Sequence, residues 1–118
     1  MRLRGSVLAI TLCIAACTSS STTQQTTSAE ISAMAPLKRA YPDVVMGFDV
    51  HGATTLVISL DLQAYDGMND DDAAAMERQA VSDWRNAWTK AHPAGHKRLQ
   101  VRFIDFIGRT IAERSVNA

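Results

Sequence analysis

One acidic side chain lies where a helical pattern expects an apolar one. At 100° per residue, Glu77 falls between Trp84 and Trp88, near the centre of the apolar stripe of that helix. Burying a carboxylate is costly unless a basic side chain pairs with it. Glu77 is therefore a candidate buried acid, able to anchor a cationic ligand or to do acid–base chemistry. The structural alternative is an acid that reaches water or an arginine such as Arg98 or Arg114.

Three other groups of residues resemble functional sites but have an ordinary structural explanation. Trp84 and Trp88 could stack on a sugar ring or anchor a partner, yet their place on the apolar stripe favours core packing. The spacing of His92 and His96 suits a metal ion on a continuous helix, which a proline and a glycine between them interrupt. The acidic run 66–77 has acids at the first and last positions of a calcium loop, but Met68 stands at the third position and Asp71 where the turn needs glycine, so the run suits a helix start. We therefore expect no metal and no cofactor.

Other catalytic and binding classes find no support in the chain. None of its serines lies in a G-x-S-x-G setting, and it has no glycine-rich phosphate-binding loop. Basic and acidic residues balance at 12 each, so the excess positive charge that nucleic-acid binding needs is absent. We expect a non-catalytic protein that binds no nucleic acid. A small enzyme or ligand-binding domain that uses Glu77 is the alternative.

Alternation of apolar and polar residues predicts a β-hairpin before the helix. Residues 44–50 and 54–62 each alternate with period two around a His-Gly pair. A three-residue loop over 51–53 places Phe48 opposite Leu56, which joins the two apolar faces. Because a one-residue slip would exchange the faces of one strand, we favour this loop over a two-residue one.

A long helix and one or two further strands follow the hairpin. The apolar stripe predicts the helix over 69–92, with Asn69 as its N-cap, aspartates in its first turn and Pro93 just beyond its end. Residues 98–103 alternate and predict a third strand. Residues 110–116 predict a weaker fourth strand, with a terminal helix as the alternative.

These elements predict an α+β domain with the order ββαββ. In this two-layer arrangement, one long helix packs on one face of an antiparallel sheet of three to four strands. A turn at Ile107 and Gly108 would place Arg102 opposite Glu113, a favourable cross-strand pair. Residues 30–41 are punctuated by prolines and predict either a short helix or an irregular lead-in.

The face of the sheet away from the helix is a candidate binding surface. Val45, Val57 and Ile104 are predicted to lie there as apolar islands among polar residues that include Arg102. Such a face is solvated, covered by residues 30–41, or used to contact a partner. We therefore take Val45, Val57, Arg102 and Ile104 as candidate binding residues, with an edge strand of the sheet as the other candidate contact.

The beginning of the chain has the features of an export signal. Arg2 and Arg4 precede a short apolar run over 7–16, far below the roughly 20 residues that span a bilayer. Residues 14–17 (IAAC) resemble the lipobox of bacterial lipoproteins, with isoleucine in place of the more common leucine at the first position. The resemblance implies cleavage before Cys17 and attachment of fatty acyl chains to this residue.

The same resemblance implies a cellular location. In that family an aspartate after the lipidated cysteine retains the protein in the inner membrane, and this chain has Thr18 there. The resemblance thus implies the outer membrane of a Gram-negative cell, with the domain facing the periplasm. Because Cys13 leaves with the signal and Cys17 is acylated, the mature protein would have neither a free thiol nor a disulfide.

The organisation of the chain follows from these signals. Residues 18–28 contain no charged and no aliphatic side chain and predict a flexible tether. We expect three parts: a cleaved signal peptide (1–16), a lipidated cysteine with its tether (17–29) and a small α+β periplasmic domain (30–118). The expected function is that of a lipid-anchored cell-envelope protein, whose domain is a non-catalytic binding or assembly module for an envelope protein.

Overall fold

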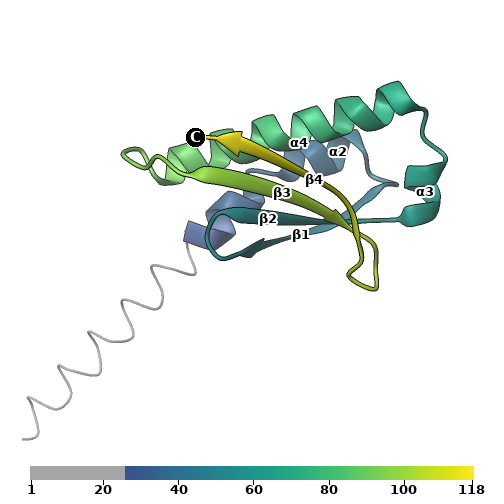
Figure 1. The fold of residues 1–118 in the computed structure, drawn as a ribbon, viewed down its shortest axis with the longest axis horizontal. Coiled ribbons are helices and arrows are strands. Elements are labelled where there is room, and N and C mark those ends of the chain that lie inside the picture. Colours follow the sequence, from purple (N-terminus) through teal and green to yellow (C-terminus); the bar gives the residue numbers. More distant parts are fainter. Residues whose placement is uncertain (1–25) are drawn as a thin grey trace, which may run out of the picture.

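The computed structural model describes residues 26–118; the predicted signal peptide and the predicted lipidation site Cys17 lie outside the described residues. Residues 26–32 are helical, and a mixed α+β domain follows (Figure 1). Its elements are α2 (Ala35–Ala40), β1 (Val45–His51), β2 (Thr55–Leu60), α3 (Leu62–Asp66), α4 (Asp70–Ala91), β3 (Arg98–Ile104) and β4 (Thr110–Asn117). The predicted fold class and ββαββ order are confirmed, with one long helix on one face of the sheet.

The sheet is mixed, and not antiparallel throughout as the sequence predicted. Its strand order is β1-β2-β3-β4, with a parallel β2–β3 pair between two antiparallel pairs. The indole Nε1 atoms of Trp84 and Trp88 donate to the carbonyls of Thr54 and Ala53 at 3.1 and 3.2 Å, so α4 ends beside the start of β2. The 22 residues of α4, about 33 Å of helix, thus return the chain to that end of the sheet, and β3 enters parallel to β2.

The β1–β2 hairpin unites the two apolar faces as predicted, with its loop displaced by one residue. The loop spans 52–54 and not 51–53, so Phe48 faces Ile58 where the sequence predicted Leu56. From Gly47 onward, the partner of each residue moves by two positions, which leaves these side chains on their expected faces. The loop carbonyls that bind the two indoles hold the turn in this position.

A β-bulge in β1 changes the face of Val45. Val45 faces Leu60 while Gly47 faces Ser59, so Met46 is an extra residue in the ladder. As a result Val45 is fully buried in the core and Met46 is 49% exposed. The expectation that Val45 lies on the far face is therefore wrong, because an alternation with period two does not continue through a bulge.

The core lies between α4 and the inner face of the sheet. Trp84 is fully buried and Trp88 nearly so, which confirms that both pack in the core. Met34 and Leu37 complete the same cluster from the N-terminal segment, so this segment covers the helix side and not the far face of the sheet. The largest side chains that the sheet contributes to this cluster are those of Val45, Leu56, Ile58, Leu60, Leu99, Val101 and Phe103.

Most element boundaries agree with those predicted from the sequence. The side-chain oxygen of Asn69 accepts a hydrogen bond from the N–H of Asp72 at 2.8 Å and caps α4. The C-terminal segment is a strand and not a helix, and Arg102 faces Glu113 as predicted, with Nε 3.0 Å from the carboxylate. The short helix α3, capped by Asp61, was not predicted because five residues do not establish a periodicity.

The helix over 26–32 overlaps the predicted tether. Residues 26–29 are helical, so the expectation of a flexible tether up to residue 29 is wrong for these four positions. Glu30 is only 4% exposed and Met34 is fully buried. Burial of these two residues favours helix in residues 26–29, which precede them.

Burial of Glu30 predicts that the domain becomes more stable on mild acidification. Desolvation raises the pKa of Glu30, and the charge of His92 offsets only part of this effect. The folded protein therefore binds this proton more tightly than the unfolded chain, and the free energy of unfolding falls as the pH rises through the raised pKa. We expect a higher Tm at pH 5 than at pH 7, and a smaller difference in Glu30→Gln.

Thermal unfolding followed by circular dichroism at both pH values measures this effect. Asp71→Asn is the matched control, because Asp71 is exposed and its variant should keep the wild-type difference. Desolvation also raises the pKa of Asp83, so Glu30→Gln should retain part of the pH dependence. If the two variants showed the same pH dependence, burial of Glu30 would not be its source.

Candidate functional site

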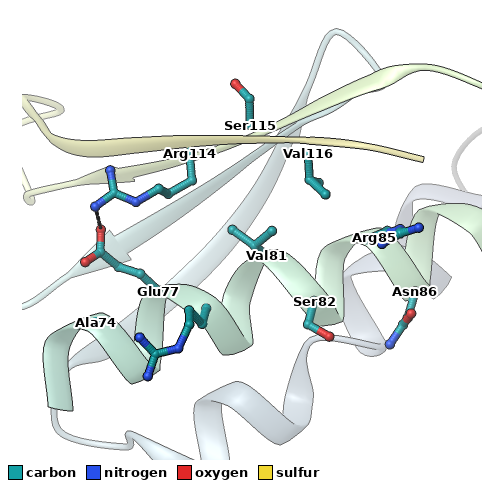
Figure 2. A pocket seen from close by; sticks show the side chains of 10 residues that line it. Ala74, Glu77, Val81, Ser82, Arg85, Asn86, Arg114, Ser115 and Val116 are labelled. Atoms are coloured by element: carbon teal, nitrogen blue, oxygen red, sulfur yellow. Dashed lines mark ion pairs between the residues drawn. The ribbon is translucent and has the colours of Figure 1, made fainter. Parts of the chain in front are cut away.

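A groove runs between helix α4 and the edge strand β4. Its volume is about 530 Å³, and one wall is a helix face while the other is the last strand of the sheet (Figure 2). The lining residues are Ala74, Glu77, Arg78, Val81, Ser82, Arg85, Asn86, Arg114, Ser115 and Val116.

Glu77 lies in this groove and is paired with an arginine. It is only 8% exposed, and its Oε1 lies 3.1 Å from Nη2 of Arg114. The register of β4 explains the contact, because Arg114 faces Val101 and thus lies on the helix side of the sheet. The structural alternative is confirmed with Arg114 as the partner. Oε1 makes this ion pair without a well-directed hydrogen bond from the described residues.

The groove combines an apolar floor with a positively charged rim. Figure 2 shows Val81 of α4 and Val116 of β4 pointing toward each other between the two walls. Arg78 and Arg85 are exposed at the helix side, and neither forms an ion pair within residues 26–118. Because Glu77 neutralises Arg114, these two guanidinium groups leave the groove with a net positive charge.

Strand β4 presents unpaired backbone groups beside the groove. The N–H of Ala118 donates to the carbonyl of Lys97 at 3.0 Å, so this is a hydrogen-bonded pair. Such pairs alternate along an antiparallel ladder. The residues whose N–H and C=O point away from β3 are therefore Glu113, Ser115 and Asn117. In agreement, the carbonyl of Glu113 is free of the ladder and accepts a bond from Nη1 of Arg114 at 2.9 Å.

The far face of the sheet holds three of the four candidate binding residues. Val57, Arg102 and Ile104 lie there, and Val57 is the direct neighbour of Arg102 across the β2–β3 pair. Val57 is only 4% exposed, and Arg102 is paired with Glu113. This face therefore offers a partner less accessible apolar surface than the sequence indicated.

The two C-terminal histidines have separate environments. His92 stacks on Trp88 with ring centroids 4.4 Å apart, and its Nδ1 lies 3.0 Å from the carbonyl of Trp88. His96 is exposed in the following loop. Between them, a Cβ atom on Gly95 would lie 2.7 Å from the Trp88 ring, so only glycine allows the chain to pass so closely.

The exposure of individual side chains in this groove could be predicted from the sequence, but the arrangement of the groove could not. Arg78 and Arg85 lie opposite the apolar stripe at 100° per residue, and both are exposed in the structure. What the pattern could not show is that the neighbouring strand is an edge strand, which depends on the strand order. No sequence signal singled out the exposed loop between β3 and β4 either.

Comparisons of the chain with protein-family models, with curated proteins and with solved structures find no match. Among the helices of residues 26–118, none is long and apolar enough to cross a membrane. The assignment of a function therefore depends on the geometry of the domain and on the signals in the sequence.

Proposed function

We propose that the chain is a lipid-anchored cell-envelope protein of a Gram-negative bacterium, whose domain is a non-catalytic binding module for another envelope protein. The anchor is the lipid on Cys17, in the outer membrane and facing the periplasm. The basic start of the chain and the small residues before Cys17 support this part of the proposal.

The observation that carries the binding role is the open edge of β4 beside the groove. An exposed edge strand is a template on which an extended segment of another chain can form backbone hydrogen bonds. Alternate side chains of that segment would enter the groove, where Val81 and Val116 provide an apolar contact. The exposed Arg78 and Arg85 favour a segment with acidic side chains.

A proline in β4 tests this mode of binding. The N–H of Ser115 points to the open side, and Figure 2 shows its side chain pointing away from α4. Ser115→Pro thus removes one donor for an added strand while it leaves the ladder to β3 intact. Ser115→Ala, the matched control, keeps the donor. We expect Ser115→Pro to lower partner capture about tenfold, and Ser115→Ala to leave it unchanged.

Capture is best measured in intact cells that express the full chain. A photoreactive amino acid at Ser82, in the groove, should form an adduct with an envelope protein, whereas one at Asp49, at the other edge of the sheet, should not. Labelling with an alkyne fatty acid, with Cys17→Ser as control, tests the anchor in the same cells. Equal adducts in the proline and alanine variants would contradict strand addition.

The alternative function is a small enzyme or ligand-binding domain that uses Glu77. Its supporting observation is that Glu77 lines the groove together with Arg114. A pair of opposite charges can bind a small zwitterionic or polar ligand as well as fix a helix to a strand. Substitution of Glu77 by glutamine separates the two functions, because only the alternative requires its charge for activity.

A further inference from the structure

The loop between β3 and β4 exposes two large apolar side chains. Phe106 is 90% exposed and Ile107 is 62% exposed. Only Met46, at 49%, joins them as an exposed large hydrophobic residue within the part of the chain that the structure describes. The loop projects beyond the end of the sheet as a narrow hairpin (Figure 1). Display of apolar side chains in this way does not stabilise the domain, so it requires another explanation.

The loop is held in one conformation by a buried aspartate. Asp105 is only 2% exposed, and its Oδ1 accepts hydrogen bonds from the N–H groups of Ile107 and Arg109 at 3.1 and 2.9 Å. Its Oδ2 lies 2.7 Å from Nε of Arg109. Gly108 follows in the left-handed region with φ 89°, a conformation that other residues rarely adopt. The apolar tip is therefore preorganised and loses little conformational entropy on binding.

The same network stays charged at neutral pH. Burial alone would raise the pKa of Asp105, but the backbone and side-chain hydrogen bonds of Arg109, its positive charge and the N–H of Ile107 outweigh burial and lower this pKa. Stability from the network is thus present above the ordinary pKa of an aspartate and is lost only as the pH falls through the lowered value.

A hollow with an acidic rim lies beside Phe106. Its volume is about 580 Å³, and its lining residues are Met46, Leu60, Asp61, Leu62, Gln63, Asp66 and Phe106. Asp61 and Asp66 make no ion pair within the described residues. An apolar hollow beside a projecting aromatic ring, with two carboxylates at the rim, is complementary to an apolar side chain that is flanked by basic ones.

The tip and the chain entry lie at opposite ends of the domain. Glu30, near the first described residues, is close enough to His92 at the end of α4 for their charges to interact. The tip follows Ile104, at the far end of the parallel β2–β3 pair (Figure 1). If the chain is anchored through Cys17, as proposed above, its linker enters at the end opposite to the tip.

We propose that the Phe106–Ile107 tip and its acidic hollow form a second docking surface, for a protein that offers an apolar side chain flanked by basic ones. The bilayer is a poorer occupant, because it is flat, its phosphates repel Asp61 and Asp66, and the anchored end of the domain is the other one. The surface is separate from the β4 groove, so one domain would connect two protein segments.

A photoreactive phenylalanine derivative at Phe106 tests the proposal in cells that express the full chain. We expect an adduct with a protein, and mass spectrometry of the adduct should place lysine or arginine within a few residues of an apolar crosslinked side chain. Asp66→Lys should lower the adduct about fivefold or more, since it reverses one rim charge. Asp49→Lys, a charge reversal on edge strand β1 outside the hollow, is the control; it also removes the Asp49–His51 ion pair.

The remaining outcomes would overturn the proposal. These are an adduct with lipid only, an adduct with a second copy of this chain, no adduct, or an adduct that Asp66→Lys and Asp49→Lys affect equally. Phe106→Ser separates binding from folding. Because the ring is 90% exposed, we expect its loss to leave the Tm unchanged while binding of the native partner is lost. Ser115→Pro should not alter the Phe106 adduct, which separates failure here from failure of the β4 groove.

Discussion

Replacement of Trp84 by alanine is expected to lower the free energy of unfolding by about 3–5 kcal/mol, the usual cost of a large aromatic truncation in a core. Trp84 is fully buried, packs in the core cluster, and donates from Nε1 to the carbonyl of Thr54 at 3.1 Å. Its loss would leave a cavity between the helix and the sheet and would also release the β1–β2 turn. Urea unfolding, followed by circular dichroism, measures the change.

Trp84→Phe separates the two contributions of this side chain. It keeps most of the aromatic volume but loses the Nε1 donor, while the carbonyl of Thr54 still accepts from the N–H of Gln100 at 3.2 Å. We therefore expect a smaller loss, about 1–2 kcal/mol. If alanine cost no more than phenylalanine, α4 would not cover the sheet as described.

Arg114→Glu is expected to lower the free energy of unfolding by about 2 kcal/mol, less than the roughly 3–5 kcal/mol for breaking a fully buried pair. The reason is that Glu77 is nearly buried but the Arg114 side chain is 54% exposed, so water screens part of the interaction. In a domain of this size such a loss lowers the Tm by roughly 8–16 °C. Thermal and urea unfolding both measure it.

Two further variants make this result specific. Arg85→Glu reverses a charge in the same groove that has no ion pair in the described part of the chain, and it should cost well under 1 kcal/mol, as a typical surface change does. Glu77→Gln combined with Arg114→Glu should recover part of the loss, because two facing carboxylates are no longer present. Equal effects of Arg114→Glu and Arg85→Glu would show that the pair does not fix β4 to α4.

The local parts of the fold could be predicted from the sequence because their causes lie within a few residues. Asn69 and the aspartates after it determine where α4 begins, and alternation determines the faces of each hairpin. The Arg102–Glu113 pair followed from the position of a single turn. Even the partner of Glu77 was among the two expected arginines, because the strand register and the helix stripe constrain it.

The parts that the sequence did not reveal depend on the arrangement of elements in space. The direction of β3 relative to β2 is set by where α4 ends, and that position depends on the contacts of two indoles with a turn far away in the chain. The bulge that buries Val45 is a single extra residue, which leaves no mark on an alternating pattern. The groove and the hollow are spaces between elements, so they exist only once the strand order is fixed.

The parallel seam between β2 and β3 has a consequence for the order of folding. The β1–β2 hairpin and α4 precede β3 and β4 in the chain, so they are synthesised first. The edge of β2 that pairs with β3 stays open until the β3–β4 hairpin docks against it. Completion of the sheet therefore depends on a non-local pairing of two hairpins, which we expect to slow folding. Until that hairpin docks, the chain exposes the edge of β2 to other chains, so this is the stage of folding at which it is most prone to associate with them.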